Sequence, residues 1–82
     1  GKEYALTTQR VTIGRSQQND ISLFREEYLP DNVGALVFQN DAWHWQGAPV
    51  VINGVATTQA VLQPGDTLQL GEMRFRFQSR SL

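Results

Sequence analysis

The 82-residue sequence contains no cysteine, a single histidine and no long apolar run. Without cysteine there can be no disulfide bond and no thiolate metal site, and this composition suits a reducing compartment such as the cytoplasm. His44 has no partner at catalytic or metal-ligand spacing, and no glycine-rich phosphate loop is present. We therefore predict that the chain is not an enzyme and has no catalytic residues, no metal and no cofactor.

Neither sign of charge dominates. Seven basic and eight acidic residues give a net charge of -1, and the sequence pI is about 5.7. Such a chain has no basic field to attract nucleic acid or anionic lipid. Its apolar runs fall far short of the ~20 residues of a membrane span, so we expect no membrane insertion by this segment. With 40% apolar residues it can build one core, and we expect residues 1–82 to be a single domain of a longer protein.

The apolar residues recur mostly with a period of two, which predicts strands, and no segment keeps a helical period. The expected strands cover residues 4–6, 10–13, 21–23, 34–39, 42–46, 50–52, 55–57, 67–70 and 73–77. Turn signals such as Asn40-Asp41, Asn53-Gly54 and Pro64-Gly65 separate them. Residues 24–32 are expected to form a loop with one helical turn. The pattern predicts an all-β sandwich of short antiparallel strands.

Two tryptophans on one strand are candidates for the core. Trp43 and Trp45 alternate with His44, so both indoles should share a face with Leu36 and Phe38 while His44 is exposed. An indole pair could alternatively stack on nucleobases or proline-rich ligands. On the last strand, the face that carries Arg74 and Arg76 is expected to point outward, where charge opposes the addition of another strand.

Two groups of motifs, in order, resemble forkhead-associated (FHA) domains over nearly the whole chain. The first is Ile13-Gly14-Arg15-Ser16 followed by Asn19-Asp20-Ile21-x-Leu23. The second comprises Asn53-Gly54, Leu62-x-Pro64-Gly65-Asp66-x-Leu68-x-Leu70-Gly71 and Phe75-x-Phe77. The resemblance implies a small β-sandwich that family members use to bind phosphothreonine peptides. In that setting the Arg15 guanidinium and the Ser16 hydroxyl would contact the phosphate.

The sequence departs from the family pattern at the rest of that pocket. The family has a Ser-Arg-x-His run before an Ala-x-aliphatic strand, and alignment on Ala35 places the serine on Asp31, the arginine on Asn32 and the histidine on Gly34. A carboxylate ~4 Å from a phosphate would repel it by roughly 1–4 kcal/mol. The family's Ser-x-Asn-Gly-Thr loop, which contacts the peptide, has only residues 46–49 in its place. We interpret the chain as a degenerate FHA domain.

Arg15, Ser16, Asp31 and Asn32 are therefore the candidate binding residues, with two interpretations left open. Arg15 and Ser16 could hold an anion. Alternatively, Arg15 holds loops together through nearby carbonyls or an ion pair with Asp31, and Ser16 caps a turn.

Three functions remain open. The first is a non-catalytic interaction or assembly module, independent of phosphothreonine, that binds a protein partner or neighbouring copies. Such degenerate domains resemble the cytoplasmic domains of inner-membrane components of bacterial secretion systems, which implies a cytoplasmic location. The second is phosphothreonine-peptide binding through Arg15 and Ser16, with Asn32 or Arg25 supplying missing contacts. The third is a regulatory domain fused to an enzyme.

Overall fold

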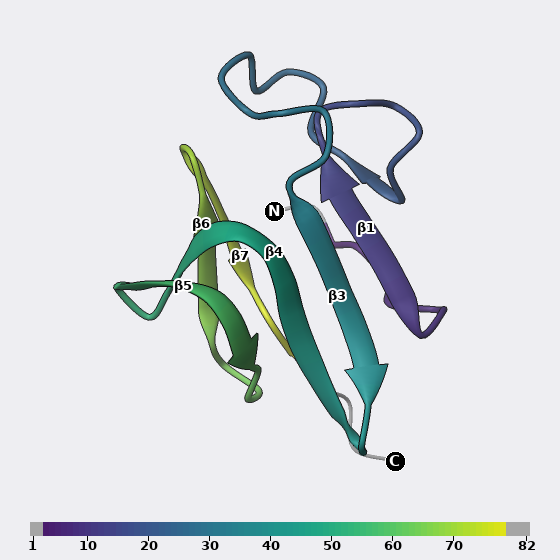
Figure 1. The fold of residues 1–82 in the computed structure, drawn as a ribbon, viewed down its shortest axis with the longest axis vertical. Coiled ribbons are helices and arrows are strands. Elements are labelled where there is room, and N and C mark those ends of the chain that lie inside the picture. The colour runs from purple at the N-terminus through teal and green to yellow at the C-terminus, as the bar shows by residue number, and fades with distance from the viewer. Residues whose placement is uncertain (1–2, 79–82) are drawn as a thin grey trace.

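A computed structural model describes residues 3–78 and shows seven strands with no helix among those residues (Figure 1). The strands are β1 (Arg10–Gly14), β2 (Ile21–Ser22), β3 (Gly34–Gln39), β4 (Ala42–Ile52), β5 (Val55–Val61), β6 (Thr67–Leu70) and β7 (Met73–Arg76). Nothing within residues 3–78 is a helix long and apolar enough to cross a membrane.

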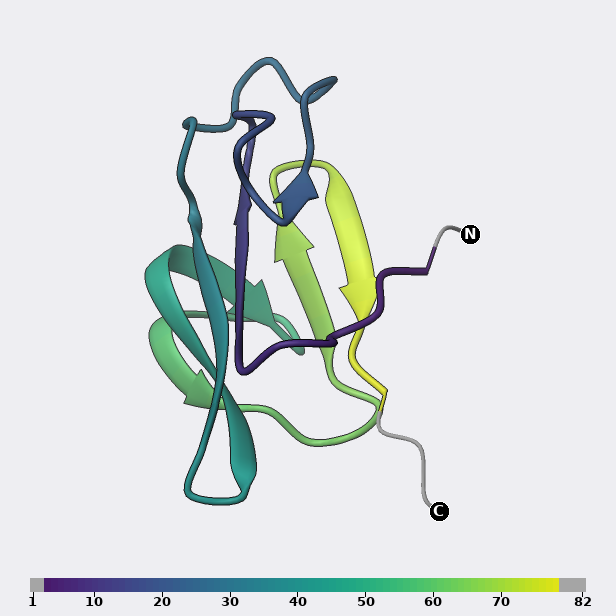
Figure 2. The same ribbon diagram turned by 90° about the vertical axis from the view of Figure 1, so that its right-hand side faces the viewer.

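The strands form a sheet that folds back on itself at β4. Its order is β2-β1-β3-β4-β6-β7, and β5 pairs with β4 as a branch. The first part of β4 pairs with β3, from Ala42 to Gly47, and its end pairs with β6, at Val51 and Ile52. As a result β1 and β3 lie in one layer and β6 and β7 in the other, with the core between them (Figures 1 and 2). The predicted all-β sandwich is confirmed.

Two details of the predicted strand pattern are wrong. β1 and β2 run parallel, with Ile13 opposite Ile21, because residues 15–20 carry the chain back across the end of β1 before β2 begins. Residues 4–6 form no strand, although Tyr4 and Leu6 pack against the core. They are anchored by side-chain packing rather than by a hydrogen-bonded ladder. The expected helical turn in the loop is also absent, since residues 24–29 form separate turns.

β4 is an eleven-residue strand where the sequence predicts two short ones. Gly47 and Pro49 lie between the two expected strands, and proline cannot donate a hydrogen bond to a ladder. In the structure Pro49 lies between the last residue paired with β3, Gly47, and the first paired with β6, Val51. The pairing with β5 is interrupted there too, between Gln46 and Val50. The missing N–H of Pro49 therefore costs no ladder bond.

The core is centred on Trp45, whose exposed fraction is 0%. Its indole Nε1 donates a hydrogen bond to the carbonyl of Ala48 at 3.0 Å, so the one polar atom of the ring is satisfied. Trp43 shares the face of Trp45 as predicted but is only partly buried, and Phe38 beside it is 37% exposed. His44, expected to be exposed, is half-buried. The other core residues are Val11, Ile13, Ile21, Leu23, Val33, Leu36, Val50, Ile52, Leu62, Leu68, Leu70 and Phe77.

The hairpin turns form where the sequence predicts them. Asn40 and Asp41 join β3 to β4 with φ values of 53° and 60°, and Asn53 and Gly54 join β4 to β5 with φ values of 50° and 86°. Two successive residues with positive φ are what a type I′ turn requires, and asparagine, aspartate and glycine tolerate that conformation best.

A network around Asn53 and Asp66 joins this hairpin to the loop before β6. The amide of Asn53 donates to Asp66 Oδ1 at 2.9 Å, and the backbone N–H of Gln63 donates to Asp66 Oδ2 at 2.8 Å. The carbonyl of the Asn53 side chain accepts from the N–H of Thr67 at 3.0 Å. The N–H of Gln63, and then the Asn53 amide, favour the charged carboxylate and hold the pKa of Asp66 below its ordinary value of 3.8.

We predict that this carboxylate makes stability depend on pH in the acid range. A depressed folded-state pKa stabilises the fold above the unfolded value, so the contribution should be present above 3.8 and be lost as pH falls through the lowered pKa. Urea denaturation of wild type and Asp66→Asn at about pH 7 and about pH 2.5 tests this. Asp66→Asn should destabilise at the higher pH and show a smaller loss on acidification. Equal acid sensitivity of the two proteins would contradict the prediction.

Candidate functional site

The turn that carries Arg15 and Ser16 is fastened to the loop before β3 through the backbone. The N–H of Arg15 donates to the carbonyl of Pro30 at 3.0 Å, and the N–H of Ser16 donates to the carbonyl of Asp31 at 3.2 Å. The side-chain amide of Asn19 also donates to the Asp31 carbonyl, at 2.7 Å, which gives a third hydrogen bond between the two loops. These bonds hold the two loops side by side at one end of the sheet (Figure 1).

The Arg15 side chain is directed at the same loop. Its Nη1 donates to the carbonyl of Glu27 at 3.1 Å, and its Nε lies 3.7 Å from Asp31 Oδ1. The side chains of Arg15 and Asp31 are 45% and 70% exposed, so the ion pair itself contributes only about 0–1 kcal/mol. These are the contacts expected if Arg15 holds the loops together.

Ser16 and Asn32 are placed differently. The hydroxyl of Ser16 accepts a hydrogen bond from the N–H of Gln18 at 3.2 Å, which is the turn-capping arrangement. Asn32 is exposed, and its side chain makes no hydrogen bond to any residue among 3–78. The guanidinium of Arg25 lies over the ring of Phe24, 5.6 Å from its centroid. The four candidate binding residues lie at one end of the molecule, but among them only the side chains of Arg15 and Asp31 contact each other. The four are Arg15, Ser16, Asp31 and Asn32.

An anion that binds Arg15 would also lie close to the carboxylate of Asp31. A guanidinium has five N–H donors, so Arg15 retains some beyond those it uses here. However, the Asp31 carboxylate already lies beside it, and like charges at such distances repel. In the part of the chain that the structure describes, no group of three acidic, histidine or cysteine side chains could hold a metal ion either.

Gly34, where the alignment on Ala35 places the family's histidine, is tightly packed in this structure. A Cβ added to Gly34 would lie 2.6 Å from the carbonyl oxygen of Gln46 and 2.7 Å from Cζ2 of Trp45. The backbone is equally tight on the other strand, where a Cβ on Gly47 would lie 2.5 Å from the Cα of Gly34. Residues 46–49, which stand in the place of the family's peptide-contacting loop, belong to strand β4.

Asp20 joins the start of β2 to β1 through Thr12. Its Oδ2 accepts hydrogen bonds from the N–H of Thr12 at 2.9 Å and from the Thr12 hydroxyl at 3.2 Å. The N–H of Asp20 in turn donates to Thr12 Oγ1 at 3.0 Å. Asp20 thus fixes the start of β2 against β1.

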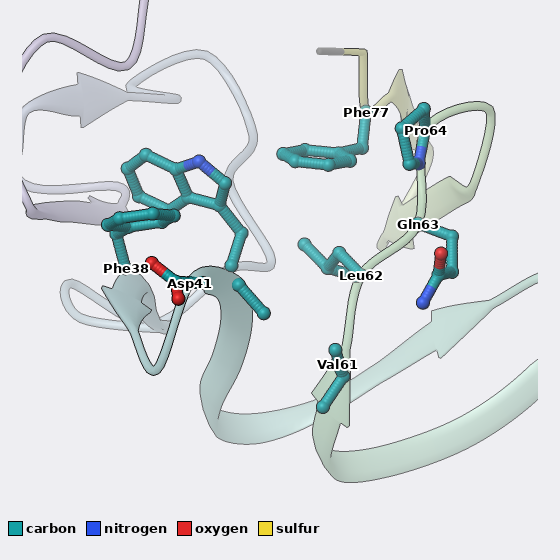
Figure 3. A pocket seen from close by; sticks show the side chains of 9 residues that line it. Phe38, Asp41, Val61, Leu62, Gln63, Pro64 and Phe77 are labelled. Carbon is teal, nitrogen blue, oxygen red and sulfur yellow. The ribbon is translucent and has the colours of Figure 1, made fainter.

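A pocket at the opposite end of the sheet was not predicted. It has a volume of about 280 Å³ and opens between the β3–β4 turn and the segment that follows β5. In Figure 3, Phe38 and Asp41 lie on one side, Phe77 and Pro64 on the other, and Leu62 between them. The sequence placed Phe38 in the core, and no local pattern shows that the ends of β3 and β5 line one pocket.

No protein-family model and no curated protein matches the sequence. Comparison with solved structures does find matches. The EmbR protein of Mycobacterium tuberculosis, solved with a low-affinity phosphopeptide, has a TM-score of 0.89 and 22% identity over 95% of this chain. This chain spans 22% of the length of that structure.

Two other matches are structures of single FHA domains. A structure from an analysis of phosphothreonine-dependent FHA domain interactions has a TM-score of 0.90 and 17% identity, and the match covers 100% of this chain and 88% of the other. The FhaA FHA domain, complexed with the intracellular domain of Rv3910, has a TM-score of 0.81 and 18% identity over 90% and 85% of the two chains. At these identities the matches establish the fold, and the chain therefore has the fold of a forkhead-associated domain.

Proposed function

We propose that this domain is a non-catalytic protein-interaction module whose binding does not depend on phosphothreonine. The fold supports an interaction role, since the similar FhaA domain was solved with a protein domain. EmbR was solved with a phosphopeptide, so dependence on phosphate is the point to be decided for this chain.

The observation that carries the proposal is the pairing of Arg15 with Asp31. The guanidinium that would contact phosphate already lies 3.7 Å from a carboxylate and is bonded to the Glu27 carbonyl. One exposed charged contact is worth about 1–3 kcal/mol before the cost of ordering the peptide. Micromolar affinity requires about 8 kcal/mol. The remaining contacts would have to come from a loop that is absent between residues 46 and 49.

We predict that phosphothreonine peptides bind no better than their unphosphorylated forms. The measurement is a titration with a degenerate phosphothreonine peptide library, followed by fluorescence anisotropy, with dephosphorylated peptides as the control. Arg15→Ala should leave the difference between the two forms at zero and act instead on the stability of the joined loops. Micromolar binding that disappears on dephosphorylation and in Arg15→Ala would refute the proposal.

That outcome would favour the second candidate function, phosphothreonine binding through Arg15 and Ser16. One observation favours this second function. The side-chain amide of Asn32 is exposed and makes no hydrogen bond within residues 3–78, so it is available to a ligand. In this case Asn32→Ala should weaken the phosphate-dependent binding, whereas Gln17→Ala, also exposed and on the neighbouring loop, should not.

We further propose that the domain works in the cytoplasm as one part of a longer protein, attached either to a membrane anchor or to an enzyme it regulates. The lack of cysteine supports a reducing compartment. The two arrangements differ in the sequence beyond residue 82, where an apolar stretch of about 20 residues would indicate a membrane anchor.

A further inference from the structure

Three strands pair on only one side within residues 3–78: β2, β5 and β7. Proteins usually protect such edges by keeping them short or by placing charges on them. β2 has two residues, and β7 exposes Arg74 and Arg76. β5 has seven residues, none of them charged and none a proline, and contacts no strand except β4. It is the unprotected edge of this part of the chain.

The main chain of β5 is open to a partner at Val61. The N–H of Leu62 donates to the carbonyl of Trp43 at 2.8 Å, so the backbone of Leu62 faces β4. Neighbouring residues of a strand direct their backbone groups to opposite sides, and the N–H and C=O of Val61 therefore point away from β4. At Gln59, two residues before Val61, the backbone carbonyl already accepts a hydrogen bond from the Thr57 hydroxyl at 2.7 Å. Accessible main-chain groups are therefore present at the end of β5, beside Val61.

Val61 is also part of the pocket wall. The pocket continues from Val61, which is 51% exposed, to the apolar side chains of Phe38, Leu62 and Phe77 (Figure 3). Its volume of about 280 Å³ is below the ~300–1,000 Å³ typical of small-molecule sites, and suits one apolar side chain. Asp41 lies beside Phe38 and makes no ion pair with any residue from 3 to 78. The wall therefore combines apolar side chains with the polar side chain of Gln63, and Asp41 adds one negative charge.

We propose that an extended segment of a protein partner adds to β5 at Val61, places an apolar side chain in this pocket and sets a lysine or arginine beside Asp41. In such strand addition the main-chain bonds supply affinity and the pocket selects the side chain. The charge of Asp41 selects the basic neighbour. This inference rests on the proposed function as an interaction module, and it assigns the partner to the end of the domain away from Arg15.

The test begins with a phage-displayed library of random linear peptides selected on the 82-residue chain. Enriched peptides should share an apolar residue with a lysine or arginine within about two positions of it, as alternation along a strand requires. The affinity of an enriched synthetic peptide is then measured by fluorescence anisotropy. Val61→Lys should weaken it at least about tenfold, and Asp41→Asn about three- to fivefold, the upper part of the range of an exposed ion pair.

Val55→Lys is the matched control. It makes the same change in the same strand at a residue that is 66% exposed and outside the pocket, so affinity should stay within about twofold. Thermal melts verify that each variant is folded. Asparagine at position 41 tolerates the positive φ of that residue, so Asp41→Asn should keep the turn.

Three results would overturn the inference. The first is the absence of enriched peptides. The second is binding that survives Val61→Lys but is lost in Arg15→Ala, which would move the site to the loops and leave the interaction role intact. The third is a wild-type dimer, seen by sedimentation, that Val61→Lys dissociates, since the edge would then be occupied by a second copy. If binding did depend on phosphate, the phosphopeptide titration would show it separately.

Discussion

Replacing Trp45 by alanine should lower the free energy of unfolding by about 3–5 kcal/mol, the cost of removing a large aromatic side chain from a core. Trp45 is 0% exposed, lies between Leu36 of β3 and Ala60 of β5 in the sheet, and packs among the core residues of both layers. The substitution also removes the donor to the Ala48 carbonyl. Urea denaturation followed by circular dichroism measures the loss.

The neighbouring residues of the same strand are the controls. His44→Ala should cost within about 1 kcal/mol, because this half-buried side chain makes one hydrogen-bond contact, to the carbonyl of Gln39 at 3.1 Å. Trp43→Ala should fall between the two, since Trp43 is only partly buried and borders the pocket. If Trp43→Ala cost more than Trp45→Ala, the centre of the core would lie elsewhere than in this structure.

The second large effect is expected at Gly34. Gly34→Ala should destabilise by about 1–3 kcal/mol, as overpacking does, because the new methyl group would lie 2.6 Å from a backbone carbonyl and 2.7 Å from the Trp45 indole. β3 has little room to shift, since Gly34 is paired with Gly47 and the two backbones lie so close that a Cβ on Gly47 would be 2.5 Å from the Cα of Gly34. Gly34→His, which introduces the residue that the alignment on Ala35 gives to the family here, should destabilise at least as much.

Asn32→Ala is the control for this pair of variants. It lies two residues away, is exposed, and should change stability by no more than about 0.5 kcal/mol in the same denaturation experiment. Unchanged stability in Gly34→Ala would mean that β3 and β4 are less closely packed than the structure shows. The family's histidine position would then be open to a side chain after all.

The parts of the fold that sequence predicts well are those governed by a few consecutive residues. Asn40-Asp41 and Asn53-Gly54 form turns because these residue types tolerate positive φ, whatever surrounds them. Alternation likewise placed Trp43 and Trp45 on one face correctly. It could not show how deep each indole lies, because depth depends on where the strand sits along the core. Trp45 is at the centre and Trp43 near the end.

Features that depend on distant segments escaped prediction. Two short strands were expected on either side of Pro49. Whether its missing N–H interrupts a ladder depends on which strands are adjacent at that point, and none pairs there. The parallel run of β2 beside β1 was hidden for the same reason. At the site, the motif placed Asp31 opposite Arg15, and the structure shows the pair in contact. The pocket at Val61 had no comparable motif.

The sharing of β4 between both layers has a consequence for how the domain comes apart. β4 forms ladders with β3, β5 and β6, so neither layer can separate from it while keeping its own hydrogen bonds complete. A domain of this size held by one common strand should lose its structure in a single all-or-none transition, without a half-folded state. Energy gained at one end, whether from joined loops or from a bound strand, therefore stabilises the entire domain.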